Sequence, residues 1–156
     1  MCSSDLTVTR VLIADEVGLG KTVEALLIAR ELLDRGEIRT VTVICPPHLC
    51  EKWRSDMAQQ FHLAAEVVRP GTIGRLSKDL PVGHSLFEAY PFTVVSLDTI
   101  KRDDYRDGFI RGCGDFVIVD EAHSCTSGKG RGRHQRYELL RGLASRGDRH
   151  LVLLTA

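Results

Sequence analysis

The sequence has 156 residues, of which 43% are hydrophobic and 27% charged, and its 21 basic and 21 acidic residues give a net charge of zero. This composition is typical of one soluble globular domain and excludes a disordered or collagen-like chain. No apolar run approaches the roughly 18 residues of a membrane span and no secretory signal is recognisable, so we expect a cytoplasmic protein without a membrane partner.

Both ends of the sequence have the appearance of a fragment. Met1–Leu6 resemble the translation of a sequencing-library adapter, and we expect residues 1–6 to be a non-native leader. An ordinary disordered tip is the alternative interpretation. At the other end, the apolar run Leu151–Leu154 is followed at once by Thr155 and Ala156. We therefore expect residues 7–156 to form one truncated domain.

Six short apolar runs rich in β-branched residues predict strands. In chain order they are Val11–Ala14, Val41–Cys45, Ala65–Val68, Phe92–Ser96, Phe116–Val119 and Leu151–Leu154. Several are apolar at consecutive positions, as expected of strands that are covered on both faces. Because helical patterns alternate with these runs, the sequence predicts an α/β fold with a mostly parallel central sheet and helices on both faces.

The helical patterns lie between the predicted strands. Thr22–Leu33 is the strongest, and Gly36 marks its end. A second helix is indicated by the four-residue spacing of Leu49, Trp53 and Met57, and a third by Tyr137, Leu140 and Leu143. The Gly-rich and polar segments Pro70–Ser85 and Ser124–Arg133 are predicted to be loops.

A phosphate-binding loop is predicted at the junction between the first strand and the first helix. The run is Asp15-Glu16-Val17-Gly18-Leu19-Gly20-Lys21-Thr22. The two glycines let the backbone curl so that successive N–H groups point at phosphate oxygens, and the helix N-terminus adds positive potential. Lys21 is suited to bind the β- and γ-phosphates and the Thr22 hydroxyl to bind Mg²⁺. Asp15 stands where the full Walker pattern has glycine, so the motif is a variant.

An acidic pair, Asp120-Glu121, directly follows the apolar run Phe116–Val119. In a parallel sheet both acids would emerge at the carboxyl edge, the edge that also carries the phosphate loop. There Asp120 is suited to hold Mg²⁺, and Glu121 to orient and deprotonate the water that attacks the γ-phosphate. An isolated acidic pair is more often a solvated turn, but the phosphate loop upstream favours an ATPase.

These motifs resemble the N-terminal motor lobe of superfamily 2 DEAD/DEAH-box helicases, in particular the SWI/SNF-type branch with its bacterial RapA-like members. Asp15–Thr22 matches motif I and Asp120–His123 motif II. The run Ile44–Leu49 with Trp53 is similar to motif Ia, Ser96–Lys101 to motif Ib, and Leu153–Ala156 to the start of motif III. The resemblance covers nearly the whole chain, with five motifs in the family's order.

The resemblance implies a RecA-like P-loop NTPase lobe that binds ATP and Mg²⁺ in a cleft shared with a second RecA-like lobe, and that moves along nucleic acid, double-stranded DNA in this branch. By position, the residues that would bind ATP, Mg²⁺ and the attacking water are Gly18, Gly20, Lys21, Thr22, Asp120 and Glu121. His123 and Thr155 would couple hydrolysis to lobe movement, and Pro47, His48, Ser96 and Thr99 would lie near the nucleic-acid backbone. As alternatives, Pro47 and His48 simply begin a helix and Ser96 simply ends a strand. Trp53 is expected to be a core residue rather than a contact.

Two parts of the family pattern lie outside this sequence: the glutamine segment that recognises adenine and the arginines of the second lobe. Losing such an arginine costs roughly 10³–10⁵ in rate in related systems. We therefore expect this chain by itself to bind Mg²⁺–ATP weakly without useful turnover. The rival interpretation is a nucleotide-dependent switch or clamp that binds nucleic acid without productive hydrolysis. The intact Glu121 argues against that interpretation.

The zero net charge conceals an uneven distribution. Between Ser124 and Arg149 there are seven basic and two acidic residues, a net charge of +5, so residues 1–123 carry −5. A polyanionic partner is therefore compatible with the neutral total. The five cysteines are odd in number and form no Cys-x-x-Cys, which favours free thiols in a reducing compartment.

Overall fold

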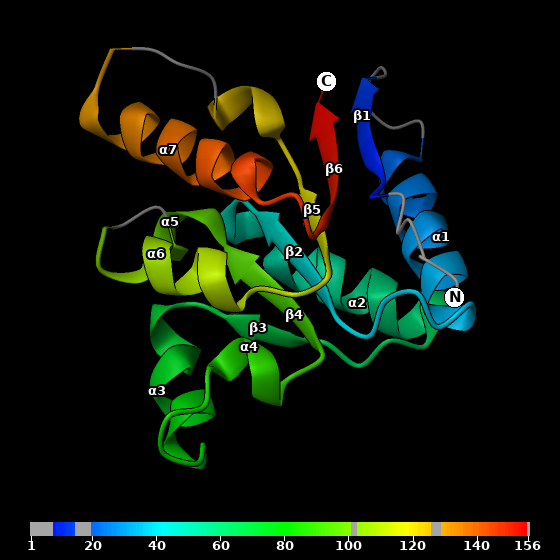
Figure 1. Cartoon of the computed structure of the whole chain (residues 1–156), viewed down its shortest axis with the longest axis horizontal. Coiled ribbons are helices and arrows are strands. Elements are labelled where there is room, and N and C mark those ends of the chain that lie inside the picture. The colour runs from blue at the N-terminus through cyan, green and yellow to red at the C-terminus, as the bar shows by residue number, and fades with distance from the viewer. Residues whose placement is uncertain (1–7, 15–19, 101–102, 126–128, 156) are drawn as a thin grey trace, which may run out of the picture.

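The computed structural model describes residues 8–14, 20–100, 103–125 and 129–155. These residues contain a six-stranded sheet in which every pairing is parallel (Figure 1). The strands are β1 (Arg10–Ala14), β2 (Val41–Cys45), β3 (Glu66–Val68), β4 (Phe92–Ser96), β5 (Phe116–Val119) and β6 (His150–Thr155), in the order β1-β6-β5-β2-β4-β3. The predicted α/β fold and all six predicted strands are confirmed, with ends that differ by at most one residue.

Helices cover both faces of the sheet, as predicted. On one face lie α1 (Lys21–Asp34) and α2 (Cys50–Phe61), the latter preceded by the 3₁₀ turn η1 (Pro47–Leu49). On the other face lie α3 (Pro70–Lys78), α4 (Leu86–Ala89), α5 (Leu97–Ile100), α6 (Asp103–Gly112), a 3₁₀ turn η2 (Ala122–Cys125) and α7 (Arg131–Ser145).

Two hydrophobic cores form because strand side chains alternate between the faces. In β5, Phe116 and Ile118 pack on the α1–α2 side, and Val117 and Val119 pack on the α7 side. All four are at most 2% exposed. Burial on both faces explains why β5 is apolar at every position rather than at alternate positions.

The prediction of a loop over Pro70–Ser85 was wrong for its first half, which forms α3. Pro70 occupies the first turn, where its missing N–H costs nothing, and the Thr72 hydroxyl accepts the backbone N–H of Arg69 at 3.1 Å. Leu76 then anchors the helix in the core at 1% exposure. These local stabilising contacts outweigh the two glycines of the helix, whose conformational freedom had suggested a loop.

The prediction of a loop over Ser124–Arg133 was also wrong at both ends. The 3₁₀ turn η2 continues through Cys125, and α7 begins at Arg131. The intervening residues 126–128 lie outside the described residues. The helices α4, α5 and α6 had no sequence prediction; α4 and α5 have four residues each, which is too few for a clear period.

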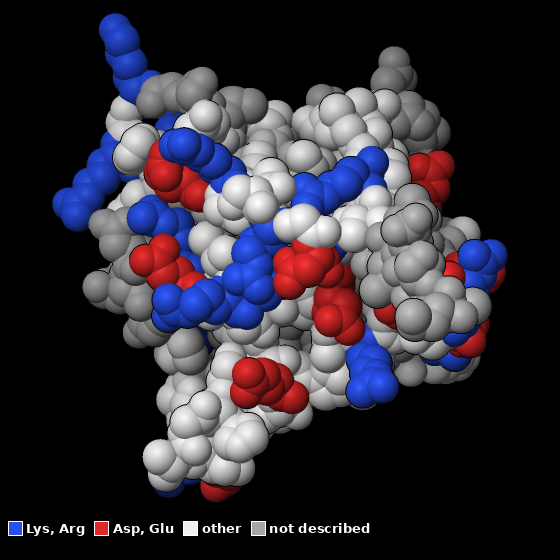
Figure 2. All heavy atoms as spheres, in the orientation of Figure 1, with Lys and Arg blue, Asp and Glu red and all other residues white. Residues whose placement is uncertain are grey.

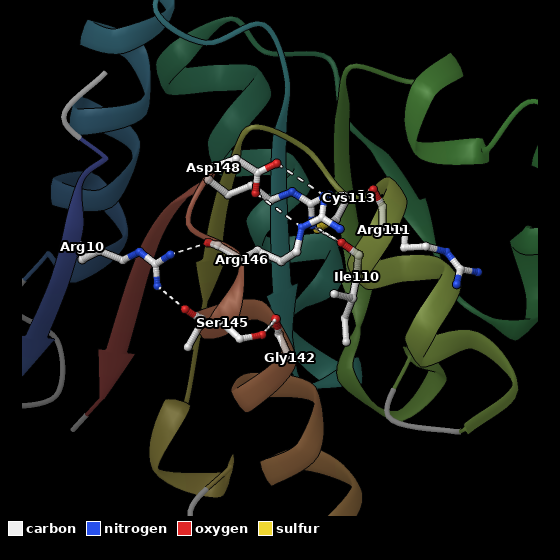
Figure 3. Close-up of polar contacts among 10 residues, drawn as sticks. Arg10, Ile110, Arg111, Cys113, Gly142, Ser145, Arg146 and Asp148 are labelled. Atoms are coloured by element: carbon white, nitrogen blue, oxygen red, sulfur yellow. Dashed lines mark hydrogen bonds and ion pairs between the residues drawn. The ribbon is translucent and has the colours of Figure 1, made fainter. Parts of the chain in front are cut away.

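At the amino edge of the sheet, two arginines bind the carbonyl ends of helices (Figure 3). The buried guanidinium of Arg149 donates to the carbonyl of Arg111 at 2.6 Å, to that of Ile110, and to the sulfur of Cys113 at 2.7 Å. Arg10 donates to the carbonyl of Ala144 at 2.7 Å. These bonds satisfy carbonyls that a helix end leaves without partners, and so they fix α6 and α7 to the sheet.

All four described cysteines are free, as predicted, and all four are buried. Among the described residues, no helix combines the length and the apolar character needed to cross a bilayer.

Candidate active site at the carboxyl edge of the sheet

The order of the strands brings three predicted motifs to one place. β6 lies between β1 and β5, and Ala14 at the end of β1 is in register with Thr155 at the end of β6. Asp120 and Glu121 follow β5, the other neighbour of β6. The end of the strand before the phosphate loop, the acidic pair and Thr155 therefore meet at the carboxyl edge, where parallel α/β sheets bind ligands.

Only the last three residues of the predicted phosphate loop lie within the described part of the chain, because residues 15–19 fall outside it. Gly20 has φ of 82°, in the left-handed region, and its carbonyl accepts the N–H of Glu24 at 3.0 Å to open α1. A Cβ at this position would meet nothing within 4 Å, so glycine is required by conformation rather than by space. Lys21 and Thr22 lie in the first turn of α1, and the positive potential at the N-terminus of a helix suits an anion.

The Asp120 carboxylate is held by two donors. Its Oδ1 accepts the backbone N–H of Glu121 at 2.8 Å, and its Oδ2 accepts the indole N–H of Trp53 at 2.9 Å. The backbone N–H of Asp120 donates to Ile44 in β2 at 2.8 Å, which continues the sheet one residue past β5. Asp120 is thus fixed in main chain and side chain alike.

Glu121 adopts a backbone conformation that is unusual for its residue type, with φ of 55°. A non-glycine residue in this region costs of order 1–3 kcal/mol and persists where its surroundings enforce it, often at functional sites. The Glu121 carbonyl accepts the N–H of Ser124 at 2.9 Å, which closes the turn into η2. This turn directs the Glu121 carboxylate, whose side chain is 39% exposed, towards His123.

A chain of polar contacts joins the acidic pair to the phosphate-loop lysine. His123 Nε2 lies 3.1 Å from Glu121 Oε2, and His123 Nδ1 lies 3.2 Å from the Thr155 hydroxyl. The Thr155 carbonyl accepts from Lys21 Nζ at 3.0 Å. Because a carboxylate only accepts, Nε2 carries a proton, and in the neutral imidazole Nδ1 accepts from the Thr155 hydroxyl. The residues predicted for catalysis and for coupling thus form one continuous network.

The chemistry of this donor set fits a magnesium–triphosphate group. The Thr22 hydroxyl and the Asp120 carboxylate are hard oxygen ligands of the kind that Mg²⁺ prefers. The Asp120 carboxylate has about four acceptor positions and uses two in the contacts described, which leaves room for a metal or its water ligands. Lys21 and the N-terminus of α1 supply the positive charge that phosphates require.

The four residues predicted to lie near nucleic acid divide into two groups. Pro47 and His48 are exposed in η1 and line a cavity of about 340 Å³ with Asp98, Glu121 and Arg136 among its walls. Ser96 is 2% and Thr99 3% exposed, so their side chains lie inside the fold, where Ser96 ends β4 as the alternative interpretation held. In this conformation only Pro47 and His48 present their side chains at the surface.

The segment that carries Pro47 and His48 is flanked by two buried thiols. Cys45 ends β2, Cys50 begins α2, and their sulfur atoms lie 3.6 Å apart. The hydrogen bond from the Cys45 thiol to Cys50 raises the pKa of Cys45, with burial as the second cause, and lowers the pKa of Cys50. This contact ties the two ends of the Pro46–Leu49 segment together.

Sequence reasoning missed two features of the site. Trp53 is a core residue, as predicted, at 2% exposure, but its contact with Asp120 spans 67 positions and no local pattern indicates it. Arg136 of α7 lies 3.3 Å from Asp98 of α5 and reaches the cavity beside Glu121, although in the sequence it is one member of a basic segment.

The basic segment 124–149 is only partly available at the surface. Arg149 is buried and Arg146 pairs with Asp148 at 3.4 Å, so both make their contacts within the fold at the amino edge of the sheet. Figure 2 shows Lys and Arg side chains interleaved with acidic ones over α6 and α7 on the viewed face. The excess positive charge therefore lies on the side of the sheet that also carries the cavity lined by Arg136.

The model of the SNF2-related domain family matches residues 1–141 of this chain. The chain belongs to that family. Among relatives of this SNF2-related chain, an uncharacterised ATP-dependent helicase, YqhH, of Bacillus subtilis is 31% identical over 147 residues, covering 94% of the chain and 23% of that protein. The RNA polymerase-associated protein RapA of Proteus mirabilis is 34% identical over 115 residues, covering 73% of the chain and 12% of that protein.

Solved structures agree with this family at the level of the fold. The Sulfolobus solfataricus SWI2/SNF2 ATPase core in complex with dsDNA aligns with a TM-score of 0.68 at 18% identity, over 93% of this SNF2-related chain and 27% of that structure's chain. The predicted resemblance and the predicted RecA-like architecture are therefore confirmed. The chain spans about a quarter or less of the length of these relatives, so the activity of a whole protein is a matter for proposal.

Proposed function

We propose that this chain is the nucleotide-binding lobe of an ATP-dependent motor that moves along double-stranded DNA. The observation that carries the proposal is the continuous network from Lys21 through Thr155 and His123 to Glu121. It joins the phosphate-binding lysine to the candidate general base through the residues expected to couple hydrolysis to movement. The relative YqhH, described as an uncharacterised ATP-dependent helicase, supports the same class.

The reaction is hydrolysis of ATP to ADP and phosphate by in-line attack of water. Gly20, Lys21 and Thr22 hold the phosphates at the start of α1, and Asp120 and Thr22 hold Mg²⁺. When bound, Mg²⁺ neutralises charge on the phosphate oxygens. Glu121 orients the attacking water and accepts its proton, and the Nε2–H of His123 at 3.1 Å holds the Glu121 carboxylate in place. The remaining residues of the predicted phosphate loop, 15–19, lie outside the described part of the chain.

The chain alone would bind Mg²⁺–ATP without useful turnover. Arginines that stabilise the transferring phosphoryl group belong to the second RecA-like lobe in this family, and such arginines are worth about 10³–10⁵ in rate. The open, solvent-exposed side of Glu121 is consistent with a site that a second lobe completes, since its side chain is 39% exposed. We therefore assign hydrolysis to the complete protein and binding to this lobe.

DNA would bind across η1 and the neighbouring cavity. Pro47 and His48 are exposed there, Arg136 supplies positive charge, and Glu121 forms part of the same wall. A related fold has been solved in complex with dsDNA, which supports duplex DNA as the partner. Ser96 and Thr99 would contribute through the backbone of the β4–α5 junction, because their side chains are buried.

The deciding experiment compares radiolabelled-ATP hydrolysis by the complete gene product with that of its Glu121→Gln variant, each with and without duplex DNA. Removing a general base lowers the rate by roughly 10²–10⁴. Glu31→Gln is the matched control, because Glu31 is an exposed α1 residue whose carboxylate pairs with Arg35 at 2.8 Å. Full hydrolysis by Glu121→Gln would refute the assignment. Nucleotide-dependent DNA binding with no hydrolysis in the unmodified protein would favour the switch or clamp instead.

A further inference from the structure

Trp53 is the single tryptophan of the sequence, and it joins the α1–α2 core to the candidate metal site. Its ring is 2% exposed and packs in the same core as Met57 and Phe61 of α2. Its indole N–H points out of this apolar surrounding and donates to Asp120 Oδ2 at 2.9 Å. A buried residue of α2 is therefore in direct contact with the carboxylate proposed to hold Mg²⁺.

The geometry of Asp120 depends on this contact. The backbone N–H of Glu121 binds Oδ1 and the Trp53 indole binds Oδ2, so the plane of the carboxylate is set by one donor on each oxygen. The Glu121 donor is the next residue of the chain and moves with Asp120. The indole belongs to a separate helix with its own core packing. It therefore holds the carboxylate in a fixed orientation relative to the core.

We propose that Trp53 is a positioning residue that holds the Asp120 carboxylate in the orientation that binds Mg²⁺ and that transmits movement of α2 to this site. The inference rests on the proposed function, since it assumes that Asp120 serves Mg²⁺–ATP. Partners that orient metal ligands contribute typically 10- to 100-fold to metal affinity. A rigid indole with a single donor is well suited to this task, because it offers one direction of hydrogen bonding.

The position of Trp53 in the chain gives the contact a second consequence. α2 follows η1 without interruption, and η1 carries the exposed residues Pro47 and His48. Trp53 lies in the first turn of α2, close to that junction. A ligand that shifts η1 would shift the start of α2 and with it the indole. Binding at η1 would thereby alter the orientation of Asp120 at the nucleotide site.

The first test removes the donor and keeps the ring. Benzothienylalanine, in which sulfur replaces the indole N–H, is incorporated at position 53 of the 156-residue chain, and ATP binding is measured by calorimetry over a range of Mg²⁺ concentrations. The expected result is a Mg²⁺ requirement raised about 10- to 100-fold, with the Mg²⁺-independent part of ATP binding unchanged. Met57→Leu is the matched control, because Met57 is equally buried one turn further along α2 and has no N–H to donate.

The second test uses the emission of Trp53 itself. Saturating Mg²⁺–ATP is expected to change the fluorescence of the unmodified chain, whereas the Asp120→Asn variant is expected to show a smaller change at the same occupancy. A purely structural tryptophan would leave the Mg²⁺ requirement unchanged when its N–H donor is removed.

Three results overturn the inference. An unchanged Mg²⁺ requirement in the benzothienylalanine protein refutes the positioning role while the proposed function stands. An unchanged emission at full calorimetric occupancy refutes it in the same way. Absence of any Mg²⁺-dependent ATP binding by the unmodified chain refutes both the inference and the proposed function.

Discussion

Replacing Arg149 by methionine tests whether the amino edge of the sheet depends on a buried cation. Arg149 is 7% exposed and donates to the carbonyls of Ile110 and Arg111 at the end of α6. Methionine keeps an unbranched apolar stem of similar length, so the variant removes the donors with little loss of packing. The two carbonyls, which are partly buried, would then lack the guanidinium donors.

The size of the effect follows from those two carbonyls. A buried acceptor left without a partner costs about 1–3 kcal/mol, so we expect Arg149→Met to lower the free energy of unfolding by roughly 2–4 kcal/mol after partial access of water. The measurement is urea denaturation followed by circular dichroism, with an unchanged slope and a lower midpoint. A loss of this size is a substantial fraction of the total free energy of unfolding of a typical domain.

Arg146→Met is the matched control for this prediction. Arg146 belongs to the same basic segment, but its side chain is 37% exposed and pairs with Asp148 at 3.4 Å. Exposed pairs of this kind contribute about 0–1 kcal/mol. If the two variants lost equal stability, or if Arg149→Met lost less than about 1 kcal/mol, the reasoning from buried carbonyls would be refuted.

Two further predictions concern a buried thiol and the basic surface. Burial raises the pKa of Cys113 from 9.0 to about 11, so its contribution to stability is present below pH 9 and is lost as the pH rises towards 11. The fall in denaturation midpoint between pH 9 and 11 should therefore be smaller in Cys113→Ala than in the unmodified chain, and equal slopes would contradict this. Arg136→Ala should weaken duplex DNA binding. It should also lower the slope of log affinity against log salt concentration by the amount expected for about one phosphate contact, measured by fluorescence anisotropy at several salt concentrations. Arg141→Ala, which changes an exposed arginine paired with Glu138 at 3.7 Å, is its control, and equal losses in both variants would remove Arg136 from the interface.

Much of the site was predictable because its signals are local. Phe116–Val119 is apolar at every position, and this run alone places Asp120 and Glu121 at a strand end. Gly20 before Lys21 and Thr22 likewise indicates a strand-to-helix turn, and Gly20 does adopt a positive φ there. Periodicity and backbone preference are properties of neighbouring residues, so they can be read without knowing the fold.

Other features could not be read from the sequence because residues far apart create them. α3 depends on Leu76 having a core to bury in, and the interior position of Ser96 and Thr99 depends on the helices that pack over β4. Neither property is present in the segment taken alone, where glycines suggested a loop and polar side chains suggested an exposed contact.

The sequence by itself determined the strands, the phosphate-loop junction, the acidic pair and the resemblance to a helicase lobe. Only the tertiary structure decided which of these residues touch. Lys21 reaches Thr155 across 134 positions and Trp53 reaches Asp120 across 67. The physical reason is the order of the sheet, since β6 lies between β1 and β5, and β2 lies beside β5. That order arises from the packing of all six strands and both helical layers together, so no single motif contains it.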